Sequence, residues 1–183
     1  MRKERFKQVD FEYLYRKVLE EQYAAFSGMK TARVLARLAL PGETVVTTVY
    51  DVLTDSFIEE VNGTSSTDDI VVSQSMIVDV DLTWFNSYIV KADKFKKLYK
   101  VTEETWPSAE EKGYEPVPVP KLMYQVNEDL AFPYPSHWGR EGWFYLQAGG
   151  VLVPENDKEF YGINPYELAS TYSLAPLGAP CNM

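Results

Sequence analysis

Hydrophobic and polar positions first follow a helical period, close to the N-terminus. In residues 11–26, FEYLYRKVLEEQYAAF, the apolar side chains recur every three to four positions and mark one face of a helix. Asp10 can accept hydrogen bonds from the first free backbone N–H groups, and Gly28 can supply the left-handed conformation that ends a helix. The pattern therefore predicts an N-terminal amphipathic helix within residues 1–30.

Beyond this helix the pattern changes to short, partly β-branched segments separated by turn residues, which is typical of strands. The predicted strands include residues 33–40, 44–50, 69–73, 143–147 and 149–153. Between the two halves, residues 106–120, WPSAEEKGYEPVPVP, carry alternating prolines. Because proline forbids a helix and favours an extended chain, this segment is predicted to be a linker.

Residues 87–101 and 160–174 carry the same apolar pattern. Tyr88, Val90, Phe95 and Tyr99 in the first stretch match Tyr161, Ile163, Leu168 and Tyr172 in the second. Each stretch is predicted to be the second strand of a hairpin followed by a short helix, from Asp93 to about Tyr99 and from Pro165, where Asn164 can act as the cap. Since a hairpin is too narrow to bury its own face, we expect each helix to close a small core.

These elements predict an α+β fold, in which an N-terminal helix is followed by two related small antiparallel β modules that each end in a short helix. The predicted domains are the amphipathic helix at 1–30, a first β module at 31–105, the proline-rich linker at 106–120, and a second β module with the tail at 121–183. Apolar positions are kept between the two copies and polar ones are not, as expected of an internal repeat.

The hairpin-and-helix pattern resembles the C-terminal signature of small phage-encoded proteins grouped under the name PGDYG. The matching residues are Asp69-Ile70-Val71-Val72, Tyr88-Ile89-Val90, Asp93, Phe95 and Tyr99, with an approximate second copy in Gly149-Gly150-Val151-Leu152-Val153, Tyr161-Gly162-Ile163, Leu168 and Tyr172. The second copy departs from the signature at Leu168, where phenylalanine is usual, and lacks the acid after glycine. The resemblance implies a bacteriophage or prophage origin and implies no particular chemistry.

Composition places the chain among globular proteins. Of its 183 residues, 45% are hydrophobic and 25% are charged, which is outside the range of disordered chains. Its single cysteine cannot form an internal disulfide, and no apolar run approaches the ~18–20 residues of a membrane span. The N-terminus also lacks the apolar core of a signal peptide. We therefore expect a cytoplasmic protein, in the host cytoplasm for a phage protein, with no membrane partner.

The net charge of −9 is unevenly distributed. Residues 1–40 have an excess of lysine and arginine, so the basic N-terminus could pair with an acidic surface of the chain or with a partner. From Leu38 to Val90 there is no lysine or arginine, and the carboxylates there are expected to stand unopposed. An acidic body repels phosphate backbones, so direct nucleic-acid binding is unfavourable, but such carboxylates could occupy the basic cleft of a host enzyme. The acidic candidates for binding are Asp51, Asp55, Glu59 and Glu60.

Residues 132–143, FPYPSHWGREGW, combine aromatic rings, glycines and one arginine. Such a loop could stack a nucleotide base with Arg140 at a phosphate, or anchor a protein partner, because Trp, Tyr and Arg dominate interface hot spots. It could also be a structural loop whose rings cover the core of the second module. The candidate binding residues in this segment are Tyr134, His137, Trp138, Arg140 and Trp143.

Motifs for catalysis and metal binding are scarce. His137 is the only histidine, and although Ser136 and Glu141 are close in sequence, no nucleophile elbow surrounds the serine. A loop histidine is the simpler interpretation. One histidine and one cysteine exclude a zinc site made of nitrogen and sulfur ligands. We expect no cofactor, no metal and no catalytic residue.

The sequence therefore favours a non-enzymatic bacteriophage protein that binds a host factor, and that inhibits a host defence or nucleic-acid enzyme through its acidic face or through residues 132–143. The alternative is a small-molecule binder that sequesters a nucleotide-like signal with Trp138 and Arg140. An enzyme of unknown type is a third hypothesis. A host protein is the most expected partner, and the sequence leaves the oligomeric state open.

Overall fold

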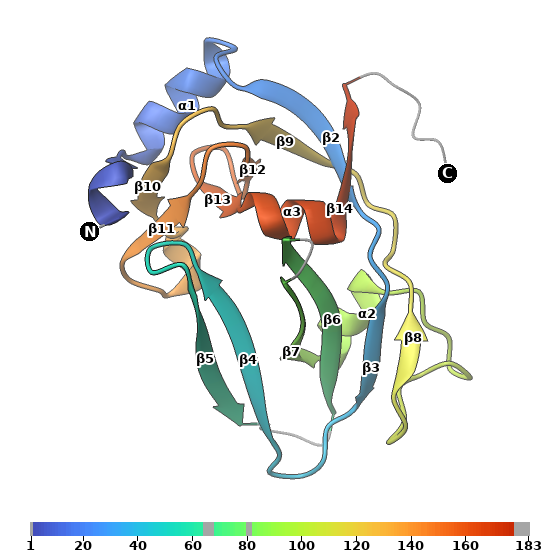
Figure 1. Ribbon diagram of the computed structural model, residues 1–183. Coiled ribbons are helices and arrows are strands. Elements are labelled where there is room, and N and C mark those ends of the chain that lie inside the picture. The colour runs from blue at the N-terminus through green and yellow to red at the C-terminus, as the bar shows by residue number, and fades with distance from the viewer. Residues whose placement is uncertain (1, 64–67, 80–81, 178–183) are drawn as a thin grey trace. The chain divides into compact units, whose positions relative to one another are not determined.

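The computed structural model describes residues 2–63, 68–79 and 82–177, and in these residues fourteen strands form four sheets beside three short α-helices (Figure 1). The predicted fold class is wrong, because the chain is mostly β and is not an N-terminal helix followed by two helix-capped modules. None of the described helices combines the length and the apolar composition needed to cross a membrane. Two compact units are present: unit 1 comprises Met1–Met29, Val52–Thr54 and Pro120–Met183, and unit 2 comprises Lys30–Asp51 and Asp55–Val119.

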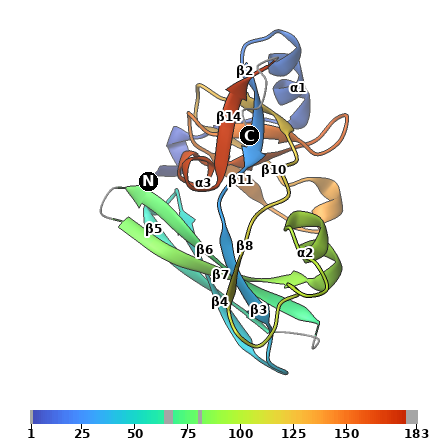
Figure 2. The ribbon, with the colours of Figure 1, turned by 90° about the vertical axis from the view of Figure 1, so that its right-hand side faces the viewer.

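Unit 2 is built on a four-stranded antiparallel sheet in the order β7-β6-β3-β8. Its strands are β3 (Val34–Leu38), β6 (Asp69–Asp79), β7 (Leu82–Lys91) and β8 (Lys112–Tyr114). Helix α2 (Ala92–Leu98) covers one face of this sheet, where Phe95 packs in a core with Ile70 and Val72 (Figure 2). The other face carries the hairpin of β4 (Thr44–Asp51) and β5 (Ser56–Gly63), whose Val45 packs against Val71. The first part of β6, from Asp69 to Val72, is therefore buried on both faces.

Unit 1 contains a five-stranded sheet in the order β13-β12-β9-β2-β14 and a three-stranded sheet in the order β1-β10-β11. The first consists of β2 (Ala24–Lys30), β9 (Lys121–Gln125), β12 (Val151–Pro154), β13 (Phe160–Ile163) and β14 (Tyr172–Pro176). The second consists of β1 (Lys7–Gln8), β10 (Leu130–Pro133) and β11 (Trp143–Leu146). The helices are α1 (Phe11–Leu19) and α3 (Pro165–Thr171), with two short 3-10 turns, η1 (Arg2–Arg5) and η2 (Ser136–Trp138).

The N-terminal helix α1 is shorter than the sequence pattern predicts. Asp10 caps its start as expected, since its Oδ1 accepts a hydrogen bond from the backbone N of Tyr13 at 2.8 Å. The helix ends at Leu19, and Glu21 takes the left-handed conformation, with φ +53°, that the pattern assigned to Gly28. Gly28 instead lies within β2, so the predicted helix is followed by a turn and its last residues, from Ala24, belong to a strand.

Residues 106–120 are more than a linker, because they supply β8, which pairs with β3. Strand β8 is the fourth strand in the sheet β7-β6-β3-β8 of unit 2. Strand β2 has the same place in the five-stranded sheet of unit 1. Both lie outside the modules predicted at 31–105 and 121–183. Each unit therefore completes its sheet with a strand from a distant part of the chain, and this is why neither predicted module is self-contained.

One local arrangement occurs in both units, at the two stretches that share an apolar pattern. In the β6–β7 hairpin Ile70 pairs with Val90 and Val72 with Tyr88; in the β12–β13 hairpin Val151 pairs with Ile163 and Val153 with Tyr161. Each hairpin leads into a seven-residue helix. In unit 2 the next strands of the sheet are β3 and then β8, and in unit 1 they are β9 and then β2. The matching registers make these parts of the two units structurally equivalent.

Candidate functional site

The four candidate acids lie on the hairpin of β4 and β5, residues 44–63, which we call the acidic hairpin. Glu59 and Glu60 are in β5, while Asp51 ends β4 and Asp55 lies in the turn. All eight residues of β5 are exposed. The strand is therefore accessible on both of its faces.

Apolar side chains flank these acids on both sides in β5. Val61, in β5, is 68% exposed and stands opposite Val46, which is also exposed. Ile58 is exposed on the other face of the strand. The rings of Tyr50 and Phe57 meet edge to face across the hairpin, with their centroids 5.6 Å apart. The acidic hairpin thus combines negative charge with exposed apolar surface.

Two carboxylates of the cation-free stretch are not unopposed, which corrects the expectation from the sequence. Glu43 accepts hydrogen bonds from the guanidinium of Arg37, and its Oε2 also accepts one from the backbone N of Leu40 at 2.9 Å. Asp69 is 1% exposed and pairs with Lys91 at 2.6 Å. The two cations, Arg37 and Lys91, lie just outside the stretch, one at each end.

The Arg37–Glu43 pair makes the stability of unit 2 depend on pH in the acidic range. The hydrogen bonds from Arg37 lower the pKa of Glu43 from 4.5 to about 2. The contribution of the pair to the free energy of unfolding is therefore fully present above the pKa of Glu43 in the unfolded chain, and it is lost as the pH falls towards 2. For a partly exposed pair we expect this contribution to be about 1 kcal/mol. Urea unfolding of wild type and Glu43→Gln should differ by this amount at pH 7 and converge near pH 2. A constant difference across this range would contradict the assignment.

The aromatic loop, residues 132–143, joins β10 to β11 in unit 1. The rings of Tyr134, Trp138 and Tyr161 form a row, with centroid separations of 6.3 Å and 5.8 Å. The guanidinium of Arg140 lies 4.6 Å from the centroid of Tyr134, at one end of the row. Tyr161 belongs to β13 and packs on the core of Val151, Val153 and Ile163, so the row extends from the loop to a strand of unit 1.

Two carboxylates from the turn between β12 and β13 hold the aromatic loop. Glu155 pairs with Nε2 of His137 at 2.9 Å, and Glu159 accepts a hydrogen bond from the backbone N of Ser136 at 3.1 Å. The only histidine therefore contacts a carboxylate of the turn, rather than the serine and glutamate beside it in sequence. Among the residues that the structure describes, no group of three or more His, Cys, Asp or Glu side chains is placed to hold a metal ion.

Charges of both signs surround the aromatic row: Arg140 lies at the Tyr134 ring, and Lys121 Nζ donates a hydrogen bond to the hydroxyl of Tyr161 at 3.1 Å. Burial, together with the carboxylates of Glu155 and Glu167, raises the pKa of Tyr161 to about 12. The row therefore lies between carboxylates on one side and two cations, so its charge alone does not select the sign of a ligand.

Trp143 is not part of the row. It opens β11 opposite Pro133 and lines a separate open pocket of about 430 Å³ beside Lys7, Tyr13 and Arg16. The structure thus brings four of the five predicted loop residues together, while Asp51, Asp55, Glu59 and Glu60 form a second surface on the acidic hairpin.

A hydrogen-bonded centre at Glu128 was not predicted. Its carboxylate accepts hydrogen bonds from the hydroxyls of Tyr23 at 2.9 Å and Tyr13 at 3.0 Å, and Lys7 Nζ lies 3.6 Å away. Burial alone would raise the pKa of Glu128, but these hydrogen bonds hold it below its usual value. No local pattern points to this centre, because Tyr13 and Tyr23 are more than a hundred positions away in sequence.

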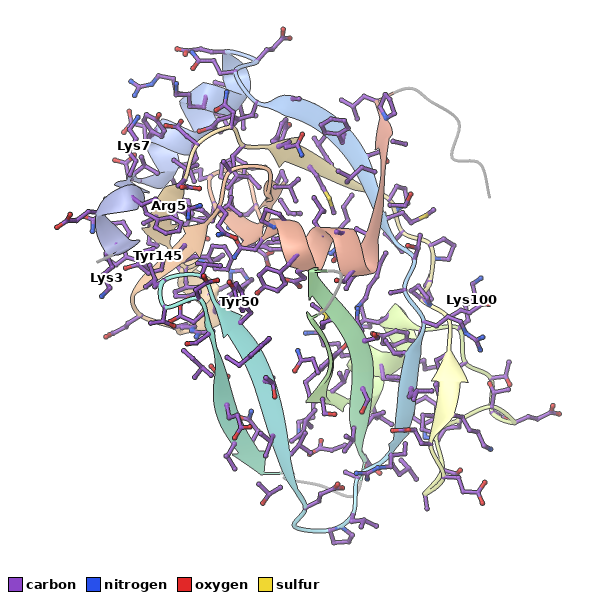
Figure 3. All side chains as sticks on the ribbon, in the orientation of Figure 1. Lys3, Arg5, Lys7, Tyr50, Lys100 and Tyr145 are labelled. Carbon is purple, nitrogen blue, oxygen red and sulfur yellow. The ribbon has the colours of Figure 1, made fainter. Side chains whose placement is uncertain are left out.

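The neighbouring Asp129 pairs with Arg5. Figure 3 shows Arg5 and Lys7 in the segment that precedes α1, where both cations meet acids of unit 1. Part of the basic N-terminus is therefore used inside unit 1 to anchor this segment.

Comparisons of the chain with protein-family models, with curated proteins and with solved structures find no match in any of the three.

Proposed function

We propose that this chain is a non-enzymatic, bacteriophage-encoded protein that binds a basic region of a host protein through the acidic hairpin. The observation that carries the proposal is the exposure of every residue of β5, in which Glu59 and Glu60 lie between apolar side chains. The motif resemblance to PGDYG proteins supports the phage origin.

Exposed strands of this kind are usually protected or paired. In the described residues β4 and β5 form a two-stranded sheet of their own, and the edge of such a sheet is where another chain can add a strand. An exposed apolar patch among polar residues is typical of protein interaction sites. The combination of a strand edge and apolar side chains fits the addition of an extended segment from a partner.

Charge decides which kind of partner fits. Two copies of this chain that paired along β5 would bring their own Glu59 and Glu60 together, and like charges across an interface cost affinity. A segment rich in lysine and arginine would be attracted instead. If that segment lines the nucleic-acid-binding cleft of a host enzyme, occupancy by the acidic hairpin would inhibit the enzyme.

Charge reversal on β5 tests this proposal. We expect the Glu59→Lys, Glu60→Lys double variant to lose at least about tenfold in affinity for the captured host protein, because attraction becomes repulsion. The measurement is capture from host lysate, identification by mass spectrometry, and titration of the purified partner. Glu103→Lys with Glu104→Lys is the matched control, since both residues are exposed in unit 2 outside the hairpin.

Unchanged affinity for the host protein after charge reversal on β5 would contradict the proposal. Loss of binding in the control as well would show a general charge effect instead of a site. The alternative is a nucleotide-like ligand on the aromatic row, where Arg140 lies at the Tyr134 ring, and a thermal shift with nucleotides that disappears in Trp138→Ala would favour it.

A further inference from the structure

A pocket of about 580 Å³ lies in unit 1 between α1 and the turn that joins β12 to β13. Its aromatic walls are Phe11 and Tyr15, which are one helical turn apart on α1. The remaining lining residues are Glu12, Asp157, Lys158 and Glu159.

The two aromatic side chains of the pocket differ in how far they are buried. Phe11 is half-buried and packs against Phe132 of β10, with the ring centroids 6.3 Å apart, so it forms a fixed floor. Tyr15 is 44% exposed and forms a side wall. The faces of such rings attract cations, and they also cover the apolar stem of a bound side chain.

The rim of the pocket carries three carboxylates and one ammonium group. Glu159 is held in place by hydrogen bonds from the backbone N of Ser136 at 3.1 Å and from the side-chain amide of Asn156 at 2.7 Å. Hydrogen bonds from Ser136 and Asn156 keep the pKa of Glu159 below its usual value, so this group is ionised at neutral pH. The rim is therefore net negative above an aromatic floor.

We infer that this pocket binds the side chain of an arginine presented by a partner polypeptide. A guanidinium is planar and stacks on aromatic rings, and its fork of N–H donors matches carboxylates at the rim. An anion would be repelled by the rim, and an uncharged ring would bury the carboxylates without replacing their hydration. The inference concerns unit 1 and is independent of the function proposed for the acidic hairpin.

The test is an NMR titration of the full chain, labelled with nitrogen-15, with capped tripeptides. The arginine peptide Ac-Ala-Arg-Ala-amide is compared with its citrulline counterpart, which keeps the shape of the side chain and removes the charge. A lysine peptide and free spermidine complete the series. The peptide is added up to about 10 mM, which detects binding with a Kd in the millimolar range. We expect the largest saturable shifts at residues 11–15 and 157–159 with the arginine peptide, weaker shifts with the lysine peptide and spermidine, and none with the citrulline peptide.

Substitutions at the pocket should change the affinity for the arginine peptide in opposite directions. Tyr15→Ala and Glu12→Gln should each weaken arginine binding about two- to fivefold, the range of exposed cation–π and ion-pair contributions. Lys158→Gln should strengthen binding about twofold, because it removes a like charge from the rim. All three residues are exposed, so their replacement should preserve the fold, and Glu141→Gln, an exposed acid of unit 1 outside the pocket, should change nothing.

Several outcomes would overturn the inference. Equal binding of the arginine and citrulline peptides would show that charge is not recognised. Spermidine binding as tightly as the arginine peptide would assign the pocket to free amines instead of a partner's side chain. Absence of shifts at the pocket, or weaker binding after Lys158→Gln, would remove the site altogether.

Discussion

Replacement of Phe95 by alanine is expected to destabilise unit 2 by about 3–5 kcal/mol. The ring is fully buried, and it lies at the centre of an aromatic cluster. The centroids of Tyr99, Tyr114 and Trp106 are 4.8, 5.2 and 6.3 Å from it. Alanine would leave a cavity that these large rings cannot fill without leaving their own contacts. Urea unfolding gives the change in free energy, and hydrogen exchange in β3 and β6 locates it in unit 2.

The matched control for this prediction is Leu98→Ala on the same helix. Leu98 is 38% exposed, so its truncation should cost less than about 1 kcal/mol. If both variants lost the same stability, the effect would come from the helix itself and the aromatic cluster would not be the core of unit 2.

Leu14→Ala is the second substitution with a large expected effect, a loss of about 2–5 kcal/mol in unit 1. Leu14 is fully buried on the inner face of α1, in a core shared with Leu130, Phe132 and Leu146 of the three-stranded sheet. Since α1 is only nine residues long, an isolated helix of this length is marginal in water, and packing must hold it in place. Faster hydrogen exchange in α1 and β10, with a lower urea midpoint, would report the loss.

Leu19→Ala on the same helix serves as the control, because Leu19 is 64% exposed and should contribute less than about 0.5 kcal/mol. A small effect of Leu14→Ala would mean that α1 is attached to unit 1 chiefly by Arg5, Lys7 and Tyr13 through Asp129 and Glu128. In that case Glu128→Ala would be the more damaging change.

Helix starts were predictable, because their signals are local. Asp10 caps α1 as expected, and α3 begins at Pro165 as expected. Asn164 occupies the N-cap position of α3, but its side chain makes no capping hydrogen bond, which corrects the prediction. It accepts a hydrogen bond from the backbone N of Gln147 at 2.9 Å and donates one to the carbonyl of Tyr145 at 3.1 Å, so it ties α3 to β11.

The candidate sites were predictable in part. The aromatic content of residues 132–143 and the charge of the acidic hairpin are visible in the sequence, but the third ring of the row, Tyr161, comes from a different strand. The pocket beside Tyr15 was missed, because its two sides are more than a hundred positions apart in sequence.

By itself, the sequence determined elements whose backbone hydrogen bonds are satisfied nearby, namely the start of α1, the hairpin before α3, and helices α2 and α3. Before α2 it predicted only the outer strand segments, because β6 and β7 continue through residues expected to form a long loop. Only the tertiary structure decided that residues 24–30 and 112–114 are strands, where the pattern indicated a helix and a linker. The physical reason is that a helix bonds to itself, whereas a strand exists only beside a partner. For β2 and β8 those partners are β9 and β3.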